Sequence, residues 1–265
     1  MSTFADLHAG PLPLLLPNAW DVPSALAFLA EGYPAIGTTS FGVASSLGRP
    51  DGGRATREAN LRLAEQLRPL PVFVSIDIED GCSDDPDEVA AYVARLGVDG
   101  VNLEDSTAER LVDPAAFAAK VAAVKARSPG VFVNARIDTY WLHQDETVEA
   151  TLARAAAYTA AGADGVFVPG AGDPEVLRAI TGALDVPVNV LALPGRTLGE
   201  LGELGVRRVS TGSLPYRAAV TAATRAAAAV RDGVEPPSAA AYDELQARLT
   251  SYVASDPDRR PRPPT

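Results

Sequence analysis

The stretch PVFVSIDIEDG, residues 71–81, combines the pattern of a buried strand with a cluster of acids at its end. Side chains alternate between the two faces of a strand, so the apolar residues at 74, 76 and 78 share one face, whereas Ser75, Asp77 and Glu79 share the other. Two neighbouring carboxylates repel each other and are costly to take out of water unless a positive group compensates them. The stretch therefore predicts a buried strand that ends at a charged site, with a positive partner close to it.

The rest of the chain repeats this alternation of short β-rich runs with amphipathic or alanine-rich helical stretches, several of which end in glycine. An open doubly wound sheet and a closed barrel both fit such alternation. Eight units in about 250 residues favour the barrel, and no strand is followed by a glycine-rich phosphate-binding motif. We therefore predict an α/β fold, a (β/α)8 TIM barrel, with strands in residues 13–20, 35–42, 71–81, 100–106, 131–140, 165–170, 187–195 and 206–213.

Composition argues against several classes of function. The 265 residues carry a formal net charge of −11 and have a pI near 4.7, which argues against a nucleic-acid surface. One cysteine cannot form an internal disulfide, and two histidines cannot supply a zinc site built on several imidazoles. The two lysines fall in a helical stretch where a Schiff-base aldolase could not use them. No apolar run approaches the ~20 residues of a membrane span, and the N-terminus lacks a signal-peptide pattern, so we expect a cytoplasmic protein.

The chain is expected to form one main domain with a C-terminal addition. Residues 1–236 hold the eight units and form the predicted catalytic barrel. Residues 237–255 form an extra helix that has no place in a ring of eight, so we expect it to pack on a neighbouring subunit. Residues 256–265 contain too little apolar surface to fold and are predicted to be disordered.

Charged side chains at the carboxyl ends of three successive predicted strands should meet at one mouth of the barrel, where catalytic groups lie. After Asp77 and Glu79, the next strand supplies Glu104 and the following one supplies Arg136. One arginine cannot neutralise three carboxylates, so we predict that Asp77, Glu79 and Glu104 hold a divalent metal ion. Because the ligands are oxygen atoms, the metal is expected to be Mg²⁺ or Mn²⁺.

Other polar residues near the predicted mouth fall into groups with different expected roles. Asn134 and Asn189 lie on the inward faces of their strands and are candidates for substrate binding. Cys82 and His143 lie in loops at the same end, and the pattern leaves open whether either takes part in catalysis. Four further acids are expected only to cap helices or to form ion pairs, namely Asp80, Asp84, Asp85 and Asp105.

Seven segments resemble, in the same order, members of the isocitrate lyase/phosphoenolpyruvate mutase superfamily. The resemblance runs from about Pro17 to Arg217. It implies a (β/α)8 barrel with Mg²⁺ near the three carboxylates, bound partly through water, and Asp51 farther from the metal. The matching segments are PNAWDVPSALAFLAEGYPAIGTTSFGVASSLGRPDGG, PVFVSIDIEDG, GVNLEDS, VNARIDTY, GADGVFVPG, PVNVLALPG and LGELGVRRVSTGSLPYRAA.

The resemblance also implies an activity. Arg136 would bind a substrate carboxylate and, with Asp51, serve catalysis, while Ser40, Phe41 and Gly42 would lie along the substrate. The chemistry shared by such enzymes is the formation of a pyruvate-like enolate, so we expect a Mg²⁺-dependent lyase that cleaves a C–C bond in a small α-oxo or 2-hydroxy carboxylic acid. Members typically form homodimers or homotetramers that exchange a C-terminal helix.

The segment that follows GVNLEDS departs from the family pattern. It reads TAERLVDPAAF and lacks both the Lys-Lys-Cys-Gly-His loop of the lyases and the Lys-Asn-Ser loop of the mutases. Two alternatives therefore stay open beside the C–C lyase. One is a mutase or hydrolase that acts on the P–C bond of phosphonopyruvate or carboxyphosphonoenolpyruvate, and the other is a barrel that binds a dicarboxylate without turnover.

Overall fold

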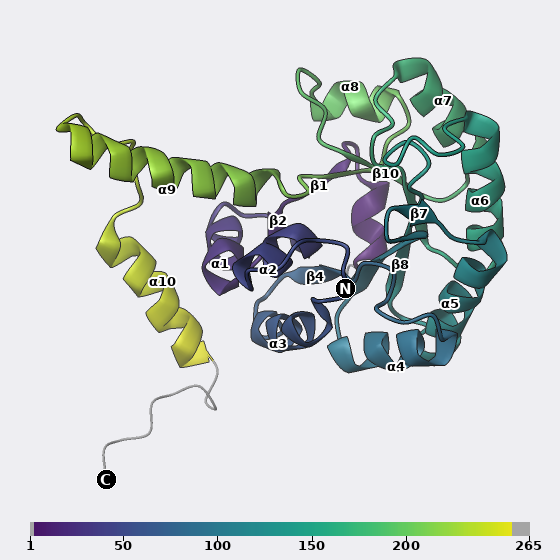
Figure 1. The fold of residues 1–265 in the computed structure, drawn as a ribbon, viewed down its shortest axis with the longest axis horizontal. Helices are drawn as coiled ribbons and strands as arrows, with labels where there is room; N and C mark the ends of the chain where they lie inside the picture. Colours follow the sequence, from purple (N-terminus) through teal and green to yellow (C-terminus); the bar gives the residue numbers. More distant parts are fainter. Residues whose placement is uncertain (1–2, 256–265) are drawn as a thin grey trace, which may run out of the picture.

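The computed structural model describes residues 3–255 and shows a parallel barrel surrounded by helices, as the sequence predicts (Figure 1). The strands of its sheet run in the order β1-β11-β10-β9-β8-β5-β4-β3-β2. A separate antiparallel hairpin, β6 (Ser106–Thr107) and β7 (Arg110–Leu111), follows β5. The strands of the barrel are β1 (Leu14–Leu16), β2 (Asn18–Ala19), β3 (Ala35–Thr38), β4 (Phe73–Asp77), β5 (Gly100–Glu104), β8 (Phe132–Arg136), β9 (Gly165–Phe167), β10 (Val188–Leu191) and β11 (Arg208–Ser210).

The barrel is closed by its first strand, which Pro17 divides into β1 and β2. Proline has no backbone N–H, so it interrupts a ladder at that position. β1 pairs with β11 on one side and β2 pairs with β3 on the other, while the carbonyl of Pro17 accepts a hydrogen bond from the amide of Gly37 at 2.8 Å. The nine segments of the sheet therefore act as the eight strands that the sequence predicts.

The helices of the ring owe their limits to local capping residues. In α4, Asp85 accepts a hydrogen bond from the amide of Asp87 at 2.8 Å, proline occupies the first turn, and Gly97 ends the helix in a left-handed conformation. The helices are η1 (Ala5–Ala9), α1 (Val22–Ala30), α2 (Ser40–Ser46), α3 (Arg57–Leu67), α4 (Pro86–Leu96), α5 (Pro114–Arg127), α6 (Val148–Ala160), α7 (Pro174–Ala183), α8 (Leu198–Glu203), α9 (Leu214–Asp232) and α10 (Tyr242–Ser255).

The N-terminal end of the barrel is closed by the segment around η1. The ring of Phe4 meets that of Phe132 edge to face at 5.5 Å, and the imidazole of His8 stacks on Phe132 at 4.5 Å. Gly100 makes room for this plug, since a Cβ atom there would lie 2.7 Å from the ring of Phe4. Burial lowers the pKa of His8 to about 4, so this imidazole is neutral at physiological pH. The closed floor leaves the opposite end of the barrel as the open one.

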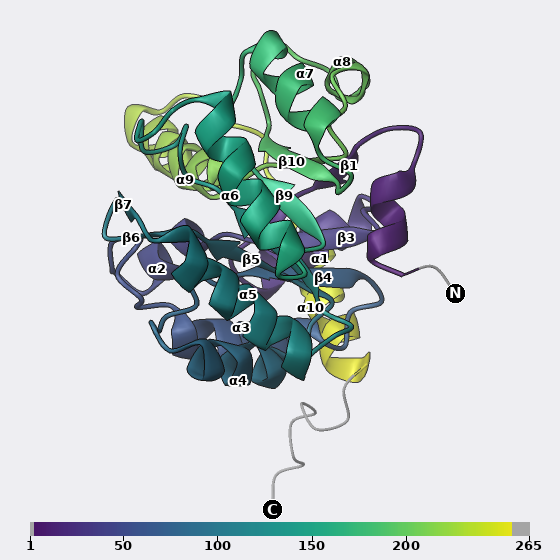
Figure 2. The same cartoon turned by 90° about the vertical axis from the view of Figure 1, so that its right-hand side faces the viewer.

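The last two helices leave the ring. Figure 1 shows α9 extending away from the barrel and α10 turning back beside it, and in Figure 2 α10 lies below the strands. α10 contacts α1 of its own chain, and the hydroxyl of Tyr252 donates to the carbonyl of Gln66 in α3 at 2.8 Å. The expected extra helix thus exists, but it is α9 that extends outward with apolar residues exposed, including Leu214, Val220 and Val230.

The tail expected to be disordered, residues 256–265, lies outside the described residues. Within residues 3–255, every helix is too short or too polar to cross a lipid bilayer.

Candidate active site

A cavity of about 600 Å³ opens at the carboxyl ends of the strands, where the sequence predicts the site. Acids dominate its charged lining. Seven acidic side chains face one basic side chain, that of Arg136, among the described residues that line it. The seven acids are Asp51, Asp77, Glu79, Asp80, Glu104, Glu109 and Asp138.

Asp77, the last residue of β4, has one carboxylate oxygen held by the protein and one unpartnered. The amide of Ser40 donates to its Oδ2 at 3.1 Å, whereas its Oδ1 is buried and has no hydrogen-bond partner among the described residues. Burial raises the pKa of Asp77 to about 6, and the negative charge of Asp51 contributes in the same direction, although Arg136 opposes both. This unpartnered oxygen is suited to receive a cation.

Glu79 does not continue the alternation that the sequence predicts, because β4 ends at Asp77 rather than at residue 81. The backbone of Glu79 is left-handed, with a φ of 53°. Its carboxylate turns to the loop before α3, where Oε2 accepts from the amide of Arg54 at 2.8 Å and Oε1 accepts from the hydroxyl of Thr56. Both oxygens of Glu79 are therefore occupied by neighbouring protein groups.

Arg136, at the end of β8, ties together two further acids. Its Nη1 donates to Glu104 and its Nε donates to Asp138 at 2.6 Å. The guanidinium lies over two rings, with its carbon 5.6 Å from the centre of Trp141 and 5.9 Å from that of Phe167. The neighbouring carboxylates outweigh burial and raise the pKa of Arg136, so it stays charged. Its Nη2 makes no hydrogen bond to any described residue and remains available to a ligand.

Glu104 is the second acid of the site whose pKa is strongly raised. Burial raises its pKa well above the ordinary value, the charge of Arg136 lowers it, and Asp77 and Asp138 add to the increase. Asp77 and Glu104 are thus both buried acids whose ionised forms lack sufficient compensation from the protein alone. A doubly charged cation between them would lower the pKa of both.

A second arginine lies below the cavity, in the middle of the barrel. Arg208 in β11 is 1% exposed, and its Nη2 donates to Asn102 in β5 at 3.1 Å. Three strands separate β11 from β5 in the sheet, so the side chain crosses the interior. The other guanidinium nitrogens, Nε and Nη1, have no partner among the described residues, and burial lowers the pKa of Arg208 to about 9. The sequence analysis did not identify this residue, although alternation places Arg208 on the same face as Ser210.

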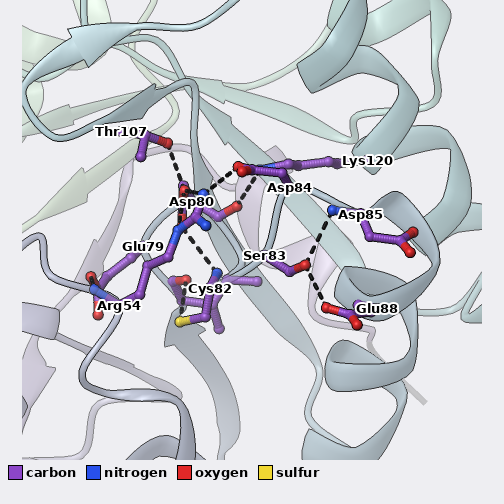
Figure 3. A network of polar contacts seen from close by, with 11 residues as sticks. Arg54, Glu79, Asp80, Cys82, Ser83, Asp84, Asp85, Glu88, Thr107 and Lys120 are labelled. Carbon is purple, nitrogen blue, oxygen red and sulfur yellow. Dashed lines mark hydrogen bonds and ion pairs between the residues drawn. The ribbon is translucent and has the colours of Figure 1, made fainter.

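The loop after β4 is organised by Asp80, as Figure 3 shows. Its carboxylate pairs with Arg54 and accepts from the hydroxyl of Thr107 at 2.6 Å, while its carbonyl accepts from Lys120 at 2.9 Å. Arg54 also pairs with Asp84. These contacts confirm the structural roles predicted for Asp80 and Asp84. They also engage two cations near the cavity, Arg54 and Lys120.

Asp85 and Asp105, the other two acids expected only to cap helices or form ion pairs, also have structural roles. Asp85 caps α4, and Asp105 is fully buried behind the site. The hydroxyl of Tyr158 donates to Asp105 at 2.7 Å, and Arg154 pairs with the same oxygen at 3.0 Å. The predicted roles of Asp85 and Asp105 are thereby confirmed.

The two loop residues whose roles the sequence left open do not join the site. Burial raises the pKa of the Cys82 thiol to about 12, and the charges of Glu79 and Asp80 act in the same direction, so the thiolate is disfavoured. The side chain of His143 is 77% exposed and pairs with Glu146 at 2.7 Å. Neither residue lines the cavity.

The residues predicted to contact substrate are only partly brought together. Ser40, Phe41 and Arg136 line the cavity, as does Asp51, which was predicted to serve catalysis. The other three do not, which corrects the prediction for them. Asn134 donates to Asn102 at 2.9 Å, Asn189 donates to Ser210 at 3.0 Å, and Gly42 packs in α2 against the side chains of Thr39 and Trp20.

Part of the cavity wall is apolar. It is formed by Phe41, which was predicted to lie along the substrate, by Trp141 and Leu142 after β8, by Phe167 in β9 and by Leu191 in β10. Leu142, Phe167 and Leu191 were not predicted, although alternation along β9 and β10 could have indicated Phe167. The position of Leu142 depends on the path of a loop, for which the sequence carries no comparable signal.

The three carboxylates predicted to hold a metal are not gathered into a ready-made ligand set. Within residues 3–255, no three His, Cys, Asp or Glu side chains are grouped so that together they could hold a metal ion. The reason is that Glu79 is bound by Thr56 and Arg54, and Glu104 is bound by Arg136. Only Asp77 presents a buried oxygen without a partner among the carboxylates described here.

Known proteins resemble the chain in sequence. A protein of Mycobacterium tuberculosis described as uncharacterised is 60% identical over 250 residues, which cover 94% of this chain and 97% of that protein. The 2-methylisocitrate lyase of Salmonella typhimurium is 30% identical over 224 residues, covering 78% of this chain and 75% of the enzyme.

Solved structures resemble it in fold. A putative lyase/mutase from Burkholderia cenocepacia has a TM-score of 0.84 and 32% identity, covering 98% of this chain and 97% of the other. A phosphonopyruvate hydrolase, solved in complex with oxalate and Mg²⁺, has a TM-score of 0.79 and 23% identity, covering 96% and 99%, and shares the fold. The model of the phosphoenolpyruvate phosphomutase family matches residues 4–231. The chain therefore belongs to the phosphoenolpyruvate phosphomutase family, within the isocitrate lyase/PEP mutase superfamily of lyases and mutases.

Proposed function

We propose that the chain is a lyase that depends on Mg²⁺ or Mn²⁺ and cleaves a C–C bond in a small α-oxo or 2-hydroxy carboxylic acid. The observation that carries this proposal is the pairing of two features in one cavity. Asp77 offers a buried oxygen that has no partner among the described residues, and Arg136 offers a guanidinium nitrogen for a carboxylate. The lyases among the relatives support the same reaction class.

The residues of the site fit a hard divalent cation. All available donors are oxygen atoms, which Mg²⁺ and Mn²⁺ prefer. Asp77 would bind the ion directly, and Glu79, Glu104 and Asp51 would reach it through water. When bound, the ion would stabilise the negative charge that develops on the oxo oxygen of the substrate as the bond breaks. A structural relative solved with oxalate and Mg²⁺ supports this choice of cation.

The protein's own groups would bind and orient the substrate. Nη2 of Arg136 would donate to the substrate carboxylate, and the pairing of Nη1 and Nε with Glu104 and Asp138 fixes the plane of the guanidinium. The rings of Trp141 and Phe167 restrict that plane further. A fixed carboxylate holds the bond to be cleaved in one orientation, which is a large part of catalysis by positioning.

A second candidate function is binding of a carboxylic acid without turnover. The observation that favours it is the lack of a proton-transferring side chain such as Cys, His, Lys or Tyr among the described residues that line the cavity. If the first proposal holds, a carboxylate of the site or a water molecule must transfer the proton. The two candidates differ in whether a product forms.

Two measurements test the proposal. Titration calorimetry with oxalate, in excess MgCl2 and again in EDTA, should show binding only with the metal. A panel of α-oxo and 2-hydroxy acids, assayed for release of pyruvate, glyoxylate or CO2, should then show metal-dependent turnover on at least one. Oxalate binding without any product favours the binding protein, and conversion of phosphonopyruvate followed by ³¹P NMR would instead assign P–C chemistry.

We also propose that the protein works as a homodimer or homotetramer in the cytoplasm. The support is α9, the helix that follows the last barrel strand, since it leaves the ring with Leu214 52% exposed, Val220 48% and Val230 74%. Burial of such residues is a main source of stability in homo-oligomers. Light scattering coupled to size exclusion should therefore give at least twice the 27.5 kDa of the chain.

A further inference from the structure

The charges around the cavity restrict how many carboxylates a ligand can carry. Arg136 is the single basic residue among the described ones that line it, against seven acids. Two of its three nitrogens are already paired with Glu104 and Asp138. The remaining nitrogen, together with a bound metal ion, can compensate one carboxylate head group.

Three other cations near the cavity are used elsewhere or lie below it. Arg54 pairs with Asp80 and Asp84, and Lys120 donates to the carbonyl of Asp80 (Figure 3). Arg208 lies below the cavity, inside the barrel. A second carboxylate, out of reach of Arg136 and the metal ion, would therefore meet acids such as Glu109 and no other cation among the described residues that line the cavity, which disfavours it.

Part of the wall is apolar and partly exposed to solvent. Trp141 is 51% exposed and Phe41 36% exposed, and both line the cavity. Leu142, beside Trp141, extends this surface, as do Phe167 in β9 and Leu191 in β10. Large apolar side chains that converge on one cavity next to a single cation are typical of a ligand with a charged head and an apolar body.

We infer that the acid bound here carries one carboxylate, next to its oxo or hydroxy group, and an uncharged apolar substituent at its other end. The carboxylate lies at Arg136, and the substituent packs against Trp141, Phe41 and Leu142. Acids that carry a further carboxylate beyond this head group are poor ligands of this cavity. The inference rests on the proposed function, since the head group is the one that the proposed lyase would bind.

The test compares two 2-oxo acids of the same length and shape. The first is 2-oxoglutarate, and the second is 5-methyl-2-oxohexanoate, in which an isopropyl group replaces the distal carboxylate. Dissociation constants are measured in excess MgCl2 by calorimetry and by the fluorescence of Trp141, which is one of two tryptophans. Since each buried methylene strengthens binding about fourfold, 5-methyl-2-oxohexanoate should bind at least tenfold more tightly than 2-oxoglutarate.

A charge-adding variant sharpens this comparison. Trp141→Arg places a cation on the apolar wall, and it should reduce or reverse the preference for 5-methyl-2-oxohexanoate. Trp141→Leu, which keeps the wall apolar, should preserve the preference. Calorimetry is used for both, because each variant removes the fluorescent reporter.

The outcomes separate this inference from the proposed function. Lack of metal-dependent oxalate binding would contradict the proposed function, and with it the inference. Oxalate binding together with equal or tighter binding of 2-oxoglutarate would overturn the inference alone. So would oxalate binding without measurable binding of 5-methyl-2-oxohexanoate.

Discussion

Substitution of Asp77 by Asn should stabilise the metal-free protein at high pH. Burial raises the pKa of this carboxyl from 3.8 to about 6, so the folded state binds the proton more tightly than the unfolded chain does. A tenfold change in proton affinity corresponds to about 1.4 kcal/mol, so keeping Asp77 ionised costs the folded protein about 3 kcal/mol. Asparagine removes that charge and can still accept the hydrogen bond from the amide of Ser40.

The pH dependence has a definite sign. A raised carboxyl pKa means that the cost is fully present above pH 6 and fades as the pH falls through the range from 6 to 3.8. Urea denaturation in EDTA should therefore show Asp77→Asn more stable than the wild type by about 3 kcal/mol at pH 8 and by less than about 1 kcal/mol at pH 4. In excess MgCl2 the wild type should gain stability, because the ion binds the folded state, and the variant should gain much less.

A matched control is Asp105→Asn, the same change at another buried carboxyl. Asp105 accepts hydrogen bonds from Tyr158, Arg154 and the amide of Asp138, so an amide NH2 would face donors there. This variant should lose about 3–5 kcal/mol at pH 8. If Asp77→Asn were as stable as the wild type or less stable at pH 8 in EDTA, the reading of Asp77 as an uncompensated charge would be refuted.

Three further variants test other parts of the structure. Arg208→Met should raise the free energy of unfolding by about 1–4 kcal/mol in urea, because it removes a buried cation with two nitrogens unpartnered among the described residues; a clear loss would show better compensation than these contacts provide. Gly81→Ala should cost more than about 2 kcal/mol by the same assay, since φ is +86° and the new Cβ would lie 2.7 Å from Val89; an unchanged midpoint would contradict this. Arg154→Met should lower the free energy of unfolding by about 3–5 kcal/mol at pH 8, because it leaves the buried carboxylate of Asp105 without its cation. The loss should be smaller near pH 4, where Asp105, whose pKa burial already raises, becomes protonated; a loss independent of pH would show that the unpaired charge of Asp105 is not its cause.

The barrel could be predicted from sequence because its strands and helices follow simple periods. Alternation placed Asp77, Glu104 and Arg136 on inward faces, and all three line the cavity. Glu79 also lines the cavity, but it does so from a left-handed backbone after the strand has ended, and not by continuing the alternation. The same rule extended β3 too far, since Ser40 begins α2 rather than continuing a strand.

The remaining errors concern residues whose partners are distant in sequence. Asn134 and Asn189 face inward as predicted, but each is bound to another residue of the interior. Arg208 escaped notice because arginine is rarely fully buried, and only the closed barrel brings it to Asn102. The position of Leu142 likewise depends on a loop that packs on the finished barrel.

The plug at the N-terminal end of the barrel has a consequence for how the chain reaches its final state. Phe4 and His8 are synthesised before the ring of Phe132 that receives them, which is made more than 120 residues later. During synthesis this segment must therefore wait, with its aromatic surface uncovered, until the chain has emerged as far as Phe132. A label or truncation in the segment around Phe4 and His8 should slow folding of the chain before it affects the active site at the opposite end of the barrel.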